Sequence, residues 1–171
     1  MANGGTMEIG AQSTMKFRTA TNHRANLDSN GYFSVYNQPS FSAYQAQSSW
    51  SVSANAVMAF NATRHNIGGH YNTSNGKFTA PIAGRYLFTF YTIMTGNYNS
   101  GYVRYYKNGA RLIGGDTHFT TNSWLGSQWH NVSFSNIIDL NANDYIEVRN
   151  GYVAVTYHGN NWQLFCGCLL G

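Results

Sequence analysis

Few side chains in this sequence have the types and spacing that chemistry requires. His65 and His70 lie on either side of residues 66–69, and a metal ion there would need a third ligand that the sequence does not offer. Cys166 and Cys168 would share one face of an extended strand, too far apart for an easy disulfide and too few to hold zinc. We expect loop or interface histidines, free thiols that pack as small apolar groups, and no metal site.

Catalytic patterns are also missing. The six Asp and Glu residues are spread thinly, and no pair has the spacing of a glycosidase or protease site. No Gly-x-Ser-x-Gly elbow occurs, and Gly68-Gly69 and Gly114-Gly115 are typical of turns rather than of a phosphate-binding loop. The sequence therefore predicts no catalytic residues, no enzyme activity and no cofactor.

Aromatic side chains are the main resource for ligand binding. They make up 16% of the residues, and flat rings can stack on sugars. The candidates for such a platform are Tyr98, Tyr102, Trp124, Trp129 and Trp162. Core and subunit packing would use the same residues, and packing is the interpretation we favour.

The composition indicates a β protein whose surface is partly covered. Charged residues are only 9% of the chain, against 18 Gly and many Asn, Ser and Thr, which suits short strands joined by polar turns. So few charges are unusual for a solvated single copy. The net charge of +4 comes from scattered Lys and Arg residues, which argues against nucleic-acid binding. No window is long and apolar enough to span a membrane, and no signal-peptide run is seen.

Two long β-type runs carry apolar residues on both faces. One covers residues 85–94, RYLFTFYTIM, and the other covers residues 162–170. A strand that is apolar on both faces must be covered twice, once by the core and once from elsewhere. The residues predicted on these runs to form a subunit interface are Tyr86, Phe88, Phe90, Leu164, Cys166, Cys168 and Leu170.

Turn signals divide the rest of the chain into short strands. Asn75-Gly76, Asn108-Gly109 and Asn150-Gly151 predict tight hairpin connections, because Asn and Gly accept the positive φ that these turns require. Residues 57–61 are predicted to form one of the strands between the turns.

Residues 1–37 are expected to form a small separate unit that ends before Pro39. It would contain strands at residues 14–19, 24–27 and 32–36, with a hairpin turn at Asp28-Ser29-Asn30-Gly31. A segment of this size cannot bury enough surface alone and needs a partner, either the same segment in neighbouring subunits or a larger assembly. The predicted anchoring residues of this unit are Met15, Phe17, Tyr32 and Phe33.

Residues 38–171 resemble the globular-head domain of complement, the C1q/tumour-necrosis-factor-like family. The residues that carry the resemblance are Asn66, Tyr71, 76–79, Pro81, Gly84, Tyr86 and Phe88, followed by 41–44, Phe60, 107–109, Asp144 and 165–170. The resemblance implies an all-β, C1q/TNF-like jelly-roll sandwich that assembles as a homotrimer. Some members of this family bind calcium through loop carboxylates; Asp116 and Asp144 are the nearest candidates here, and no calcium site is assigned.

The first unit resembles the repeat that precedes the head domain in phage tail-fibre and virion-spike proteins. The counterparts in this chain are Phe17, Thr19, Arg24, Asp28, Gly31 and Gln38-Pro39-Ser40-Phe41. The resemblance implies that the short N-terminal β-hairpin arm joins the head to a phage particle.

These patterns lead to one hypothesis and two alternatives. The protein is expected in the virion as a trimeric capsid-decoration protein, a knob or head fibre, whose partners are itself and a capsid or tail protein. A chain that is short and begins at Met suggests a whole small protein, which favours decoration over a long-shafted fibre. The alternatives are a tail-fibre tip that recognises host-surface glycans and a secreted complement- or cytokine-like ligand. No signal peptide or collagen-like run supports the last of these.

Overall fold

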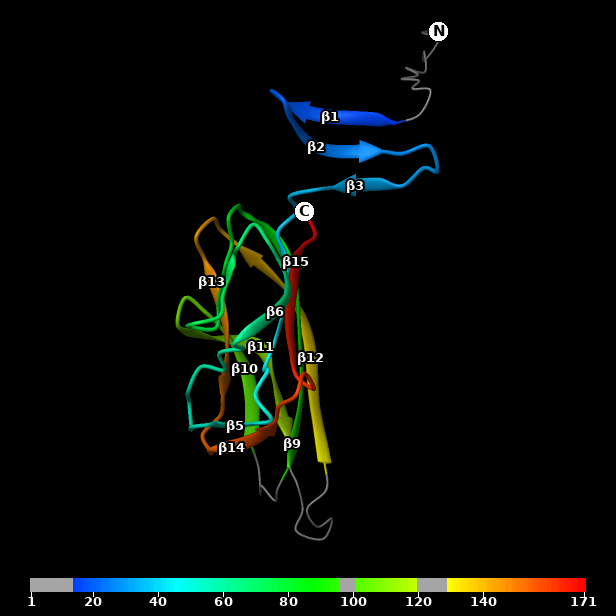
Figure 1. Ribbon diagram of the computed structural model, residues 1–171. Helices are drawn as coiled ribbons and strands as arrows, with labels where there is room; N and C mark the ends of the chain where they lie inside the picture. Colours follow the sequence, from blue (N-terminus) through cyan, green and yellow to red (C-terminus); the bar gives the residue numbers. More distant parts are fainter. Residues whose placement is uncertain (1–13, 96–100, 120–128) are drawn as a thin grey trace, which may run out of the picture. The chain divides into compact units, whose positions relative to one another are not determined.

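The structure, a computed structural model, describes residues 14–95, 101–119 and 129–171. The chain divides into two compact units, Met1–Gln38 and Pro39–Gly171, one residue after the boundary expected from the sequence. We name them the arm and the head, and each is described by itself (Figure 1). The described residues form strands, turns and irregular segments and contain no helix, so the all-β fold class is confirmed.

The arm is an antiparallel sheet of β1 (Met15–Thr19), β2 (Asn22–Leu27) and β3 (Phe33–Val35), in that order. Asp28 forms the turn between β2 and β3, since its Oδ1 accepts hydrogen bonds from the backbone amides of Asn30 and Tyr32, both at 2.9 Å. Among the described arm residues, Ala25 is the one hydrophobic side chain that is buried. The described part of the arm therefore has no core of its own.

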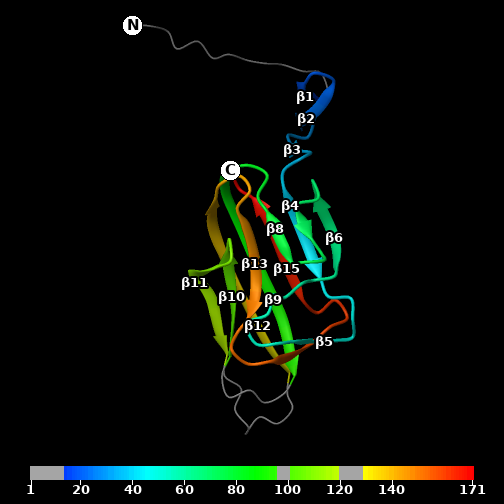
Figure 2. The same ribbon diagram turned by 90° about the vertical axis from the view of Figure 1, so that its left-hand side faces the viewer.

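The head is a sandwich of two antiparallel sheets, which Figure 2 shows from the side. One sheet has the strand order β11-β10-β13-β8-β7, and the other has the order β5-β14-β9-β15-β4-β6, with β12 paired to β9 as well. The first sheet contains β7 (Tyr71–Asn72), β8 (Lys77–Thr79), β10 (Gly101–Lys107), β11 (Ala110–Phe119) and β13 (Tyr145–Asn150). The second contains β4 (Ser40–Tyr44), β5 (Ser49–Val52), β6 (Ala62–Ile67), β9 (Gly84–Thr95), β12 (Trp129–Leu140), β14 (Val155–His158) and β15 (Leu164–Leu169).

Aromatic rings fill the space between the two sheets of the head. Phe41 is 1% exposed, and its ring centroid lies 4.8 Å from that of Tyr71, 5.1 Å from Phe78 and 4.9 Å from Phe165. Gly167 is needed at one point in this packing, because an added Cβ would lie 2.7 Å from the Phe88 ring and 2.8 Å from the Phe41 ring. The core thus holds β15 tightly between β9 and β4.

Two of the predicted hairpin turns are confirmed. Asn108-Gly109 joins β10 to β11 with φ values of 52° and 78°, the left-handed pair that a two-residue hairpin requires. Gly76 joins β7 to β8 with a φ of 73°, and its amide donates a hydrogen bond to the Asn72 carbonyl at 2.9 Å. Local turn chemistry was therefore sufficient to place these connections.

The predicted strand at residues 57–61 is wrong. Val57 makes one isolated bridge to Arg149, and the segment is otherwise irregular. Met58 and Phe60 are nevertheless fully buried in the core. The apolar residues of this segment reflect burial rather than strand pairing.

The predicted hairpin at Asn150-Gly151 is also wrong. The strands that flank it, β13 and β14, belong to different sheets, so the chain crosses from one layer of the sandwich to the other. Asn150 is 1% exposed, and its side-chain amide donates hydrogen bonds to the carbonyls of Val52, Ser53 and Val153. This Asn satisfies buried backbone groups at the crossing.

The head has a base, where its chain begins and ends. The Leu169 amide donates to the Pro39 carbonyl at 3.0 Å, and the Leu170 amide donates to the Arg85 carbonyl at 2.8 Å. The long strand β12 has Leu140 at the base and Trp129 at the far end of the head. At about 3.3 Å per residue, these two ends lie roughly 36 Å apart.

Candidate functional site

The seven-stranded sheet carries an apolar patch at the centre of the side that faces away from the core. Its central part consists of six half-buried side chains that we name the outer face: Leu87, Thr89, Tyr91, Leu164, Cys166 and Cys168. The register of β9 with β15 places Tyr91 opposite Leu164, Thr89 opposite Cys166, and Leu87 opposite Cys168, so the six share one side. On β12 and β6 this patch is bordered by Ile137, which is 57% exposed, and Ile67, which is 37% exposed. Exposed Ser133 and Ser135 on β12 lie on the same side, opposite Tyr91 and Thr89.

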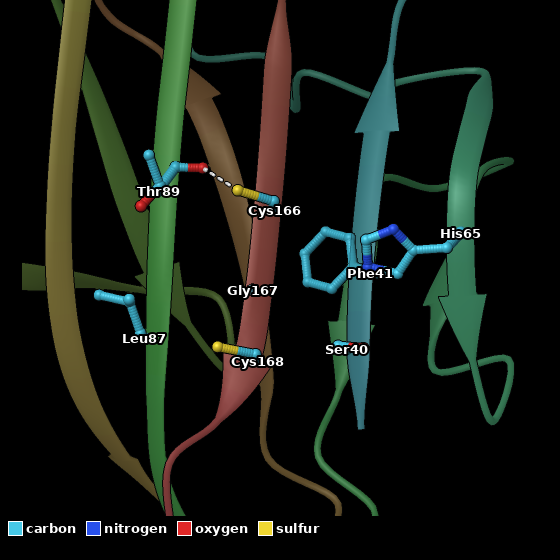
Figure 3. Close-up of a pocket in the computed structure, with 8 residues that line it drawn as sticks. All are labelled: Ser40, Phe41, His65, Leu87, Thr89, Cys166, Gly167 and Cys168. Atoms are coloured by element: carbon cyan, nitrogen blue, oxygen red, sulfur yellow. Dashed lines mark hydrogen bonds between the residues drawn. The ribbon is translucent and has the colours of Figure 1, made fainter. Parts of the chain in front are cut away.

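A shallow pocket of about 210 Å³ lies in the outer face (Figure 3). In the close-up, Cys166 and Cys168 extend from β15 toward β9, where Leu87 and Thr89 lie. The pocket also involves Ser40, Phe41, His65 and Gly167. Its wall is mainly carbon and sulfur, which suits an apolar partner rather than a polar ligand.

The two cysteines in this pocket are free thiols. Burial, and then the neighbouring Cys168, raises the pKa of the Cys166 thiol, although its hydrogen bond to the Thr89 carbonyl at 3.8 Å opposes the rise. Cys166 is therefore a poor nucleophile and behaves as a small apolar side chain. This agrees with packing and gives no support for redox chemistry.

The aromatic residues of β9 have a different place from the one expected. Tyr86, Phe88 and Phe90 are each 0% exposed within the single chain, where they belong to the core. In the register, Phe88 pairs with Gly167 and Phe90 pairs with Phe165, so these side chains share the inner face of the sheet. The expectation that they line a subunit interface is therefore corrected. Leu164, Cys166 and Cys168 lie on the outer face, and Leu170 follows β15 with 49% of its surface exposed.

The far end of the head carries a second surface, which we name the tryptophan cluster: Trp129, His158 and Trp162. The ring centroid of His158 lies 4.2 Å from that of Trp129 and 6.2 Å from that of Trp162. Trp129 is 57% exposed and Trp162 is 53% exposed, so both indole rings have a free surface. Sequence reasoning proposed both Trp residues but missed His158, which only the pairing of β14 brings between them.

An open depression of about 450 Å³ adjoins Trp162. Arg64, Tyr91 and Asn161 line it together with Gln163, which is 0% exposed. The Gln163 side-chain amide donates to the His158 carbonyl at 2.5 Å, while its Oε1 is buried without a hydrogen-bond partner among the described residues. Exposed indole rings beside a depression that is lined by polar side chains are features by which proteins hold a sugar.

The other aromatic candidates do not join the tryptophan cluster. Tyr98 and Trp124 lie outside the described residues. Tyr102 is only 9% exposed, and the Arg104 guanidinium lies 3.2 Å from its ring centroid. Tyr102 is therefore covered by a cation and is unavailable for stacking on a ligand.

The two carboxylates considered for calcium lie in separate, cation-rich surroundings. Asp116 Oδ2 accepts hydrogen bonds from Arg104 at 3.1 Å and Arg111 at 2.8 Å; partial burial opposes ionisation, but the two Arg residues lower its pKa overall. Hydrogen bonding from Asn108, then from the Asn141 amide and from Lys107, lowers the pKa of Asp144 to about 2. Within the described ranges, no three His, Cys, Asp or Glu side chains gather as metal ligands, His65 and His70 included.

Three of the four predicted anchoring residues lie on strands of the arm sheet, and Tyr32 directly precedes β3. Tyr32 is 69% exposed, Phe33 is 62% exposed and Phe17 is 48% exposed, while Met15 is half-buried. Phe17 and Phe33 come from different strands, and their rings meet edge to face at 5.9 Å. These large side chains are thus available to a partner.

The family comparison agrees with this architecture. The C1q domain family matches residues 40–170, and the chain belongs to this family. Over 119 residues it is 34% identical to one of the polypeptides of the complement C1q subcomponent of Mus musculus, covering 68% of this chain and 44% of that protein. The chain therefore spans less than half the length of this relative.

Solved structures show the same fold at low sequence identity. The globular domain of zebrafish complement 1qA protein has a TM-score of 0.63 and 16% identity, covering 78% of this chain and 98% of that one. The Eiger TNF of S. frugiperda has a TM-score of 0.66 and 10% identity, covering 79% and 94%. Murine APRIL has a TM-score of 0.60 and 10% identity, covering 78% and 99%. The C1q/TNF-like jelly roll is thereby confirmed. No described segment forms a helix that could cross a membrane.

Proposed function

We propose that this protein is a non-catalytic structural protein of a bacteriophage virion, a trimeric decoration protein of the capsid. Three heads would assemble through their outer faces, and the arms would anchor the trimer to the particle. The observation that carries the trimeric assembly is the outer face, where Leu, Tyr and Cys side chains are only half-buried within the described chain.

Burial energetics support the trimer. A fully buried Leu or Phe side chain contributes about 1.5–3 kcal/mol, so a subunit that covers the remaining half of several such side chains gains a substantial driving force. The outer face carries no charged side chain among its six members, so its cover need not supply a counter-charge. The C1q/TNF-like resemblance supplies the expected symmetry, a threefold ring of identical heads.

The arm supports a place in the virion. Its sheet has the hairpin that the phage-repeat resemblance implies, and the described part of the arm lacks a core of its own. A capsid or tail protein is the partner we propose for the arms once the trimer has assembled. Nucleic acid is not proposed as a partner.

Imaging of intact particles tests this function. An antibody raised against the full chain should label the capsid surface at regular positions, with three copies in each projecting knob. Labelling of the tail would favour the tail-fibre alternative, and particles that lack the chain would refute the virion assignment.

The similarity to the mouse complement C1q polypeptide favours a second candidate, a complement- or cytokine-like ligand. This candidate predicts that the trimer binds a cell-surface or serum protein with the affinity of a specific ligand, and that particles do not contain it. Pull-down from serum and from host cells, analysed beside purified particles, separates the two functions.

The tryptophan cluster favours a third candidate, recognition of a host-surface glycan by the far end of the head. Tryptophan fluorescence titrated with methyl glycosides of glucose, galactose and N-acetylglucosamine would detect stacking on Trp129 or Trp162. Trp162→Ala should abolish the response, whereas Tyr152→Ala, at an exposed aromatic residue outside the cluster, should keep it. No response to any of these sugars at tens of millimolar would count against this candidate.

A further inference from the structure

The arm sheet has apolar side chains on one side and polar side chains on the other. The strand register places Met15, Leu27 and Phe33 in one row across the three strands, and it places Phe17, Ala25 and Val35 in another row. The row between them consists of Lys16, Asn26 and Ser34. Because side chains alternate along each strand, the two outer rows point to one side of the sheet and the middle row points to the other.

The six side chains of the two outer rows form what we name the apolar face of the arm. Much of it is uncovered: Phe33 is 62% exposed, Phe17 is 48%, Val35 is 45% and Leu27 is 36%. The sheet has only three short strands, and a sheet of this size needs its apolar face to be packed. A partner surface is therefore required for the arm to be stable.

We propose that the apolar face of each arm packs against the apolar faces of the two other arms of the trimer. The three sheets would form a three-sided prism with the apolar rows inside and the Lys16 row outside. This inference rests on the trimer of the proposed function and adds a second contact between its subunits, separate from the heads.

The chemistry of the apolar face fits copies of itself. None of its six side chains is charged or polar, so three identical faces can meet without repulsion or unsatisfied groups. Residues 1–13, MANGGTMEIGAQS, contain Met1, Met7 and Ile9 as their only large apolar residues. That segment offers too little apolar surface to cover six side chains, which leaves another copy as the better occupant.

The point at which the chain leaves the head also favours the other arms as the cover of the apolar face. The Pro39 carbonyl accepts the Leu169 amide at the base, and Ser40 lines the outer-face pocket beside Cys168. The chain therefore leaves the head next to the proposed head interface. Three heads joined there would bring three arms close together, and short tethers raise the local concentration to the millimolar range.

Cysteine cross-linking tests the inference on the full chain. Val35→Cys places a thiol on the apolar face, and Ser34→Cys places one on the opposite face of the same strand as a matched control. Leu27→Cys provides a second reporter on the apolar face, in the other row. Each variant is oxidised and run on a non-reducing gel, with the unsubstituted chain giving the background from Cys166 and Cys168. Sedimentation equilibrium records the oligomeric state of every sample.

The expected result is a trimer in every sample, with covalent dimers at Val35→Cys and Leu27→Cys and few at Ser34→Cys. The three thiols of one trimer can form only one disulfide between them, so covalent dimers should contain at most about two-thirds of the chains. Trimers without cross-links at either apolar position, or with equal cross-linking at Ser34→Cys, would overturn this inference and leave the trimeric head intact. Monomers in the unsubstituted chain would overturn the trimer itself.

Discussion

The head and the arm are built from similar short strands, yet their apolar side chains meet different neighbours. In the head, two sheets bury Phe41, Phe88 and Phe165 completely or almost completely between them. In the arm, a single sheet leaves Phe17 and Phe33 about half exposed or more, and it buries only Ala25 among its described hydrophobic residues. The comparison shows that the described chain supplies a complete interior for the head and only one side of an interior for the arm. In the proposed trimer, the other copies supply the second side.

The largest expected effect is the dissociation of the trimer when a charge is placed on the outer face. Leu87→Glu would bury an unpaired carboxylate between heads, at a cost of several kcal/mol, so the trimer should dissociate about 100-fold more readily or worse. Leu27→Glu makes the same change on the arm and should loosen the arms while the heads keep the trimer together. Sedimentation equilibrium across a dilution series should therefore show dissociation of Leu87→Glu and an intact trimer for Leu27→Glu.

Ala110→Glu is the control for that experiment, because Ala110 is exposed on β11 of the other sheet. It should leave the association unchanged. Equal dissociation of Leu87→Glu and Ala110→Glu would show that added charge, rather than the outer face, is responsible.

Removing one ring from each unit should sharpen the contrast in stability. Phe41→Ala removes a ring in contact with several others and should lower the free energy of unfolding of the head by about 3–5 kcal/mol. Phe33→Ala should change the unfolding of the head by less than about 0.5 kcal/mol. Urea denaturation at one fixed protein concentration, followed by tryptophan fluorescence, provides the comparison. A large loss in Phe33→Ala would mean that the head depends on the arm.

One Gly→Ala substitution in each unit should destabilise the protein for a different reason. In the head the cause is lack of space for the added Cβ, and in the arm it is the backbone conformation. Gly167→Ala forces a Cβ against the Phe88 and Phe41 rings and should cost about 1–3 kcal/mol in the head. Gly31 has no atom within 4 Å of an added Cβ, but its φ is 85°. Gly31→Ala should therefore destabilise only the arm turn, by about 1–2 kcal/mol. Hydrogen exchange of the two units distinguishes these effects, and a tolerated Gly167→Ala would contradict the packing described for β15.

The smallest expected effect is a pH-dependent loss of stability when Asp144, at the base of the head, is substituted. Its folded-state pKa of about 2, lowered chiefly by Asn108, lies below the value of about 3.9 for an unfolded Asp. A lowered pKa contributes stability that is present above pH 4 and is lost as the pH falls toward 2. Asp144→Asn should be less stable than the unsubstituted chain at neutral pH, and the difference should shrink between pH 4 and 2. Thermal unfolding at several pH values measures it, and a constant difference would refute the assignment.

Turn chemistry and apolar patterning were enough to predict the all-β class and several connections. Asn108-Gly109 and Gly76 need a left-handed backbone, and this requirement is local, so it can be read from the sequence. Asn150-Gly151 has the same local signal, but the chain crosses between sheets there. The deciding factor is the set of buried carbonyls that Asn150 satisfies, and these come from distant residues.

The outer face could be predicted only in part. Alternation divides β9 into two apolar sets, but the sequence does not indicate which set meets the core. The pairing of Phe88 with Gly167 decides it, because the missing Cβ leaves room for the rings between the sheets. His158 has a similar explanation: it joins Trp129 and Trp162 through tertiary pairing, and no sequence pattern connects the three.

The most direct test of the account is the mass of the purified full chain in dilute buffer. Sedimentation equilibrium at low micromolar concentration should give a single species of about 57 kDa, three times the 19.0 kDa of one copy, as a threefold ring requires. A stable, folded species of 19.0 kDa under the same conditions would contradict the proposed interface at Leu87, Cys166 and Cys168.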